Sequence, residues 1–250
     1  MPIDTSINKI PLQKKWLETK TGRIYYFLDQ SFPSRPTVVF LHGLSANHTT
    51  WLDIIKDLHN NQFNSLAVDL RGHGFSDKAK NKSLYELAVF SEDLRQMVRQ
   101  EKLGQFFLVG YSFGGSIAID YATCNNHQLK GLILISANYA SPLNHLKLKF
   151  LNPLAIGLAN LLALLLLWQK RKEYIYFQQG ASKGYWHSVW LGLNTMPLSI
   201  NLWMMIVVGR LNFKNRLSRV RCPALIVRAK HDPFLSAAEE IGRASCRERV

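Results

Sequence analysis

The sequence is poor in cysteine and in acidic residues. The first shortage bears on the compartment of the protein, and the second on the kind of partner it binds. Three cysteines among 250 residues, at positions 124, 222 and 246, form no C-x-x-C pair and no disulfide framework, which favours a reducing compartment. Only 17 acidic residues accompany 31 lysines and arginines, giving a formal net charge of +14. That balance suits nucleic acid, an anionic membrane or an acidic substrate. No zinc spacing, RNA-binding aromatic signature or basic helix accompanies it, so nucleic acid is not an expected partner.

A secretory signal is also lacking. Residues 1–15 contain no apolar run of the kind that such a signal requires, so we expect a cytoplasmic protein. The residue patterns indicate no metal and no cofactor. An apolar share of 47% excludes wholesale disorder, and 250 residues suit one α/β domain with a buried core.

What the sequence does contain is a serine framed by glycines between a predicted strand and a predicted helix. Gly110-Tyr111-Ser112-Phe113-Gly114 follows the apolar run at 106–109 and leads into a helix-like stretch from Ser116. The glycines allow a tight bend and close packing of helix against strand. The Ser112 hydroxyl would then stand above the sheet, where the free N–H groups of the helix favour negative charge. Taken alone this nucleophile-elbow pattern is a modest signal, because small-residue clusters also occur in ordinary loops.

Two further motifs lie upstream at suitable spacing. An apolar run at 37–41 ends in His42-Gly43-Leu44, and another at 65–68 ends in Asp69-Leu70-Arg71-Gly72-His73-Gly74. In this order the three motifs resemble the α/β-hydrolase superfamily, in its esterase and lipase-like branch, over residues 10–239. The resemblance implies a mostly parallel twisted sheet with helices on both faces.

The alternation of predicted strands and helices from residue 36 independently favours such a sheet. An antiparallel hairpin turning at Thr21-Gly22 is expected to precede it. The strand centres are continuous apolar runs, as expected when both faces of a sheet are covered. The predicted strands are 11–18, 23–28, 37–41, 65–69, 106–110, 131–136 and 223–228, and the predicted helices are 49–60, 83–102 and 113–124.

A long insertion interrupts this alternation. About 85 residues separate the strand ending near Ser136 from the one starting near Ala224, which is too many for an ordinary crossover. The resemblance implies that a helical cap is inserted here, before the penultimate strand. We therefore expect a hydrolase core formed by residues 1–137 and 220–239, and a helical cap formed by residues 138–219.

The predicted cap contains a strongly apolar stretch. Residues 150–168 carry no charge, Lys147 and Lys149 precede them, and the basic residues 170–172 follow. The length meets the usual threshold for a transmembrane helix. A single span would, however, separate two strands of one sheet across a bilayer. The favoured interpretation is a lid that lines an apolar pocket. The second is a lid whose 150–172 segment also lies on an anionic membrane surface, at the inner membrane face.

Hydrolysis of an ester by a serine needs a nucleophile, a base, a carboxylate that holds the base, and donors for the developing oxyanion. Ser112 is the predicted nucleophile. The resemblance implies that the backbone N–H groups of Leu44 and Phe113 form the oxyanion hole. It also implies that Asp232, in the loop after the strand at 223–228, is the triad carboxylate.

Other motif residues are expected to support these groups. Gly110 and Gly114 frame the serine, and Gly43 belongs to the loop that carries one oxyanion donor. His42 and His73 lie inside motifs, where histidines more often hold loops by hydrogen bonds than act as bases.

The base itself is missing from its expected place. The order in this family is serine, acid, histidine, yet no histidine follows His231, and a neighbour of Asp232 cannot present its imidazole to both Asp232 and Ser112. Residues 240–250 resemble no hydrolase continuation, and codons that encode them contain a widely used sequencing adapter. We therefore expect a non-native tail, a missing last strand and a chain that is a poor catalyst as it stands.

The sequence thus predicts a serine hydrolase acting on a small-molecule carboxylic ester or lipid-like acyl substrate. Serine at position 112 argues against dehalogenases and epoxide hydrolases, which usually carry aspartate there. Thioesterases, carbon–carbon bond hydrolases and cofactor-free haloperoxidases remain open. The alternative is a non-catalytic binding or scaffold protein, because fold does not dictate function. That alternative gains weight if the missing histidine is genuine.

Overall fold

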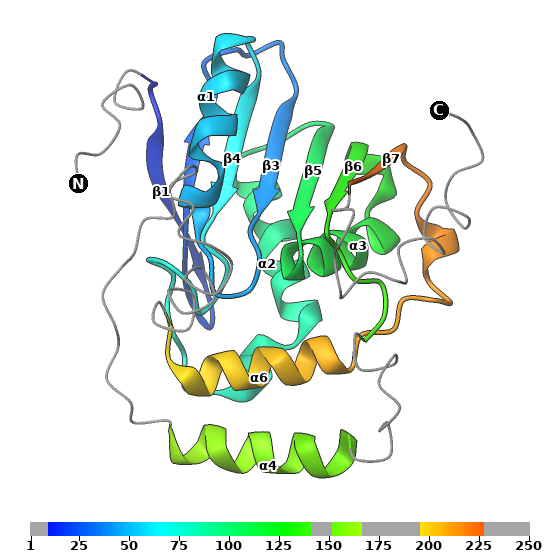
Figure 1. Cartoon of the computed structure of the whole chain (residues 1–250). Coiled ribbons are helices and arrows are strands. Elements are labelled where there is room, and N and C mark those ends of the chain that lie inside the picture. Colours follow the sequence, from blue (N-terminus) through cyan, green and yellow to red (C-terminus); the bar gives the residue numbers. More distant parts are fainter. Residues whose placement is uncertain (1–9, 142–151, 167–195, 228–250) are drawn as a thin grey trace.

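The apolar runs of the sequence form the strands of one mixed sheet. The computed structural model describes residues 10–141, 152–166 and 196–227. In this part of the chain the strand order is β1-β2-β4-β3-β5-β6-β7 (Figure 1). The antiparallel strands at one edge are β1 (Gln13–Thr19) and β2 (Gly22–Asp29), and β2 pairs antiparallel with β4. The parallel strands are β3 (Thr37–Leu41), β4 (Asn64–Val68), β5 (Phe106–Tyr111), β6 (Leu129–Ile135) and β7 (Ala224–Val227).

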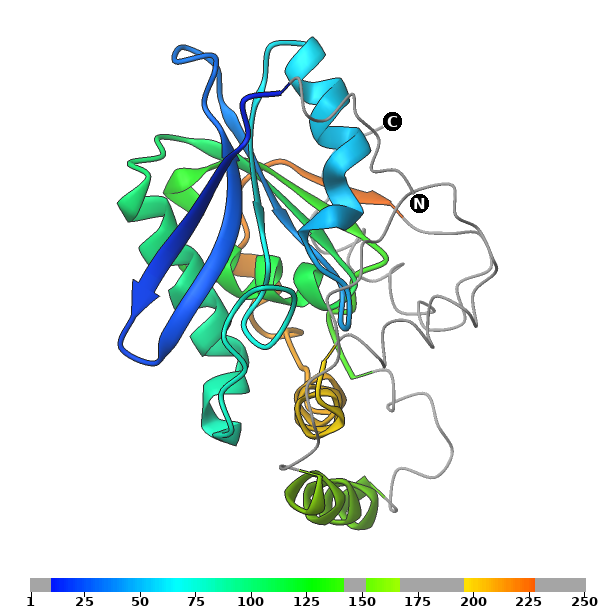
Figure 2. The same cartoon turned by 90° about the vertical axis from the view of Figure 1, so that its left-hand side faces the viewer.

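Helices cover both faces of this sheet, as its sequence predicted. Successive residues of a strand point to opposite faces, and β3 shows the consequence. Val38 and Phe40 pack with Ile55 of α1 (Leu52–Asn60). Val39 and Leu41 belong to a larger core with α2 (Leu87–Gln100) and α3 (Phe113–Cys124). Figure 2 shows α1 on one side of the sheet and α2 on the other. The prediction of a mostly parallel sheet with helices on both faces is confirmed.

Two predicted helices begin differently from the sequence expectation. The stretch 83–102 is divided into a 3-10 helix, Lys82–Tyr85, and α2, which begins at Leu87. Glu86 between them is extended, with φ −69° and ψ 146°. The stretch 49–60 likewise opens with a 3-10 helix, His48–Trp51, before α1. Apolar periodicity cannot detect such breaks, because one extended residue changes the chain direction without changing the spacing of apolar side chains.

Two helices lie in the region predicted to form the cap. In Figure 1, α4 (Asn152–Leu165) and α6 (Leu198–Gly209) lie below the sheet, at the carboxyl ends of the parallel strands. The helix α4 packs along α6, and α6 contacts the 3-10 helix before α2. Within the described residues, no helix combines the length and apolar content needed to cross a membrane. The boundaries at 138–219, the tail at 240–250 and the missing last strand stay predictions.

Candidate active site

Ser112 stands where β5 ends and α3 begins, in a conformation that few serines adopt. Its backbone has φ +50° and ψ −113°. A non-glycine residue at positive φ is costly, by roughly 1–3 kcal/mol, and persists only when its surroundings hold it. The Ser112 N–H donates to the Ile135 carbonyl at 2.9 Å, and its carbonyl accepts the Gly115 N–H at 3.0 Å. The strained turn is therefore tied both to the neighbouring strand and to its own helix.

The positions of Gly110 and Gly114 beside Ser112 leave no room for a side chain. A Cβ on Gly110 would lie 2.5 Å from the Gly114 carbonyl oxygen. One on Gly114 would lie 2.3 Å from the Leu41 carbonyl oxygen. These are backbone atoms that cannot move aside, so any side chain at either position would push α3 away from the sheet. The close approach of α3 to the sheet therefore depends on glycine at both positions.

The loop after β3 lies beside the serine. A Cβ on Gly43 would be 3.4 Å from the Ser112 Cβ and 3.0 Å from the Tyr111 ring. The next residue, Leu44, has a backbone N–H that no hydrogen bond between described residues takes up. Phe113 is the first residue of α3, and the first N–H groups of a helix have no intrahelical acceptor. The two predicted oxyanion donors thus belong to the two backbone segments that flank Ser112.

His42 and His73 are neutral and hold loops. The Nδ1–H of His42 donates to the Gly43 carbonyl at 2.8 Å, and the Nδ1–H of His73 donates to the Arg71 carbonyl at 3.0 Å. The Nε2 of His42 accepts the Leu70 N–H at 3.0 Å. Burial lowers the pKa of His42 to about 4, and burial together with the nearby His42 lowers the pKa of His73 well below its ordinary value. Neither ring has a free nitrogen for the Ser112 proton.

The loop after β4 is fixed by the buried carboxylate of Asp69. Asp69 accepts hydrogen bonds from the backbone N–H and the Nδ1–H of His48, both at 2.8 Å, and from the Phe75 N–H at 2.8 Å. Burial opposes ionisation of Asp69, but the charge and hydrogen bonds of His48 lower its pKa. No sequence signal connects His48 with Asp69, because they are 21 positions apart.

A polar contact joins α6 to the loop beside Ser112, and sequence reasoning missed it. The Ser45 hydroxyl donates to Oδ1 of Asn201, a residue of α6, at 2.5 Å, and the Ser45 N–H donates to Nε2 of His73 at 3.0 Å. Asn201 is buried, and its Nδ2 has no hydrogen-bond partner among the described residues. The available signal was an asparagine in the middle of an apolar helix.

The predicted acid and base are not brought to Ser112 by the described residues. Asp232 and His231 lie outside them. Besides His42 and His73, the Nδ1 atom of His48 contacts Asp69 and that of His59 contacts Asp29. His127 lies in the 3-10 helix Asn126–Gln128 that precedes β6, and since β6 runs parallel to β5 this is the opposite end of the sheet from Ser112. No histidine in the described part of the chain is therefore placed as the base for Ser112.

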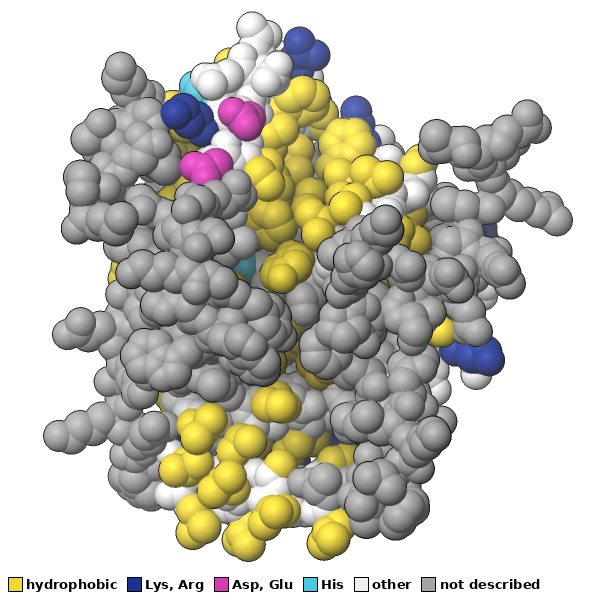
Figure 3. Space-filling view, in the orientation of Figure 1, with side chains coloured by type: hydrophobic (Ala, Val, Ile, Leu, Met, Phe, Trp, Pro, Cys, Tyr) yellow, Lys and Arg dark blue, Asp and Glu magenta, His cyan; other side chains and the backbone are white. Residues whose placement is uncertain are grey.

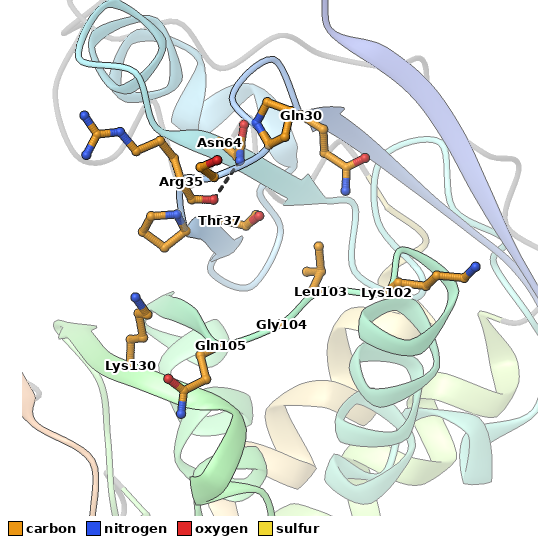
Figure 4. A pocket seen from close by; sticks show the side chains of 12 residues that line it. Gln30, Arg35, Thr37, Asn64, Lys102, Leu103, Gly104, Gln105 and Lys130 are labelled. Atoms are coloured by element: carbon orange, nitrogen blue, oxygen red, sulfur yellow. Dashed lines mark hydrogen bonds between the residues drawn. The ribbon is translucent and has the colours of Figure 1, made fainter.

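A polar hollow lies at the opposite end of the sheet. It has a volume of about 600 Å³ and contains Thr37, the first residue of β3, and Gln105, which precedes β5 (Figure 4). Arg35, Lys102 and Lys130 also line it. In parallel α/β sheets ligands bind at the carboxyl ends of strands, where Ser112 and Gly43 meet. We therefore place the candidate active site there and not in this hollow.

The comparisons with known proteins agree with this fold. The family model described as "alpha/beta hydrolase fold" matches residues 36–244, which is most of the chain. The chain belongs to that family. It is 38% identical over 105 residues to a putative 2-succinyl-6-hydroxy-2,4-cyclohexadiene-1-carboxylate synthase of Haemophilus influenzae, a match that covers 40% of each protein. The chain spans less than half the length of the curated relatives it matches.

Solved structures share the whole architecture. An esterase from Exiguobacterium antarcticum superposes with a TM-score of 0.69 at 19% identity, covering 95% of this chain and 89% of the other. A putative lipase from Acinetobacter baumannii also superposes with a TM-score of 0.69, at 20% identity, covering 96% and 82%. At such identities the similarity defines the fold alone.

Proposed function

We propose that this hydrolase acts on carboxylic esters or lipid-like acyl substrates through an acyl-enzyme formed on Ser112. The observation that carries the proposal is the backbone of Ser112, held at φ +50° at the start of α3 with Gly43 against its Cβ. An esterase and a putative lipase with the same fold support the choice of substrate class.

In the proposed reaction, the Ser112 Oγ attacks the acyl carbon and its proton passes to a base. The N–H groups of Phe113 and Leu44 stabilise the oxyanion, and the alcohol leaves after taking up that proton. Water then hydrolyses the acyl-enzyme. Asp232 is the proposed carboxylate for the base. No described histidine is placed to accept the Ser112 proton. The low activity of the chain by itself is a further part of the proposal.

Imidazole added to the solvent can test this proposal by replacing the missing base. Hydrolysis of p-nitrophenyl esters of graded chain length should be measured for the chain, for Ser112→Ala, and for the control Ser116→Ala. Ser116 lies on the same helix, but its hydroxyl donates to the Asn138 carbonyl at 3.1 Å. Without imidazole, the three proteins should be similarly slow, because triad members act as a unit.

With imidazole, the chain and Ser116→Ala should exceed Ser112→Ala by about tenfold or more, a part of the 10²–10⁴ that a positioned base contributes. If the chain instead hydrolyses the esters rapidly without imidazole, and Ser112→Ala abolishes this activity, the serine chemistry stands. The base is then a histidine of this chain. Equal rates for all three proteins, on every ester and at every imidazole concentration, would reject the proposal in favour of a binding or scaffold role.

A further inference from the structure

The outer face of α4 is a ridge of exposed leucines. Leu154, Leu158, Leu161 and Leu165 recur at the spacing of one helix face and are between 56% and 73% exposed. Leu162 and Leu164 beside them are 42% and 56% exposed. Figure 3 shows apolar side chains gathered at the bottom of the molecule, where Figure 1 places α4. Six exposed leucines on one helix make an apolar patch of the kind that marks an interaction surface.

The inner face of the same helix explains why the leucines point outward. Ala163 is completely buried, and Ile156, Ala159 and Asn160 are partly buried. These residues share the opposite side of α4, along which the helix packs on α6. The inner face therefore carries two alanines, one isoleucine and one asparagine, whereas all six leucines of α4 face away from the protein. A helix selected only to cover the core would show the reverse pattern.

Positive charge lies beside this ridge. The Lys82 ammonium donates to Oδ1 of Asn160 at 2.6 Å, which fixes a lysine against the flank of α4. Lys80 and Lys82 line a hollow of about 260 Å³ together with Leu164. The helices α4 and α6 contain no charged residue at all. In the sequence, Lys147 and Lys149 precede α4, and residues 170–172 after it are all basic.

We propose that the leucine ridge of α4, formed by residues 154, 158, 161, 162, 164 and 165, docks on an anionic lipid surface. Apolar side chains that enter the acyl boundary, combined with lysines near the headgroups, are the two attractions that bind a helix flat on a membrane. The orientation of α4 is compatible with lying flat on a membrane, because α4 lies across the end of the molecule along α6 (Figure 1). A second copy is a poorer occupant, since a formal charge of +14 on each chain opposes self-association.

Docking would bring the carboxyl ends of the parallel strands, and with them Ser112, toward the lipid. The inference does not need the chain to be active, so binding can be tested separately from the proposed reaction.

Flotation with lipid vesicles tests the proposal. The chain should float with vesicles of phosphatidylcholine and phosphatidylglycerol, bind less to phosphatidylcholine alone, and detach partly at high salt. The variant Leu158→Gln/Leu161→Gln should bind about tenfold more weakly or worse, because two exposed leucines lose their apolar surface. Its fold should be unchanged, since neither side chain is buried. Lys80→Glu/Lys82→Glu should weaken binding at low salt in particular.

A matched control uses the same chemical change elsewhere. Leu225 on β7 is 58% exposed, close to the 56% of Leu161, but belongs to the sheet and not to the cap. Leu225→Gln should float like the unchanged chain. Equal loss for Leu225→Gln and the α4 variant, or flotation unaffected by the α4 variant, would overturn the proposal. The proposal would also be overturned if the chain bound neither kind of vesicle and formed a dimer in solution that only the α4 variant dissociates.

Discussion

Two glycines, Gly114 beside Ser112 and Gly157 in α4, show how differently two regions of the molecule are built. A Cβ on Gly114 would meet backbone oxygens of Leu41 and His42 at 2.3 and 2.6 Å, whereas a Cβ on Gly157 would meet nothing within 4 Å. Backbone segments therefore pack closely around the start of α3. Among the described residues, α4 packs along one face, on α6. This difference predicts that the two helices tolerate added side-chain atoms differently.

Alanine at each glycine gives the largest expected contrast. Gly114→Ala should destabilise the chain by about 3 kcal/mol or more, because α3 and β3 must separate to admit the methyl group. Gly157→Ala should be neutral or stabilise by up to about 1 kcal/mol, since alanine is the better helix former in open space. Urea unfolding of both variants measures the difference. Similar losses of stability for the two variants would contradict the contrast between the start of α3 and α4.

Acid should weaken the core through its neutral histidines. The pKa of His42 is about 4 in the folded chain but about 6.5 when unfolded, so the unfolded state binds more protons between these values. Stability should therefore fall as pH drops below 6.5, by about 2 kcal/mol at pH 5 from His42 alone, with His73 acting in the same direction. Urea midpoints across this range test the expectation. In His42→Gln the urea midpoint should fall less steeply as the pH drops. An unchanged dependence on pH would contradict the role given to His42.

The hydrogen bond between Ser45 and Asn201 joins the two regions, and breaking it should have a moderate effect. Ser45→Ala should cost about 1–2 kcal/mol, because the Oδ1 of the buried Asn201 loses its Ser45 donor and its Nδ2 already has no partner among the described residues. Ser45→Ala/Asn201→Leu should regain most of that loss, since it removes the unsatisfied amide as well. A double-mutant cycle of unfolding free energies gives the coupling. Purely additive effects would show that the contact does not couple α6 to the loop after β3.

The smallest effect is expected on the outer face of α4. Leu158→Ala should change the unfolding free energy by no more than about 0.5 kcal/mol, because the side chain is exposed. Leu108→Ala, at a fully buried position of β5, should cost about 2–5 kcal/mol. Thermal or urea unfolding compares the two. A large loss for Leu158→Ala would mean that its side chain is packed in solution, which would also weaken the docking proposal.

Much of the fold was predictable because its signals are local. The apolar runs at 37–41 and 65–69 predicted β3 and β4 to within one residue, and the elbow placed α3 at residue 113. The contact between Ser45 and Asn201 was not predictable, nor was the pairing of His48 with Asp69, since both join residues that no local pattern connects. Asp232 as the acid, and Leu44 and Phe113 as oxyanion donors, stay predictions.

By itself the sequence determined which segments are strands, where the chain must turn, and that a serine stands between glycines ahead of a helix. These follow from the spacing of apolar side chains and the backbone freedom of glycine, which act over a few residues. Only the tertiary structure decided that Gly43 meets Ser112, that Asn201 reaches Ser45, and that the leucines of α4 face outward. Such contacts depend on how whole helices and strands pack, because only packing selects which of many apolar faces is buried.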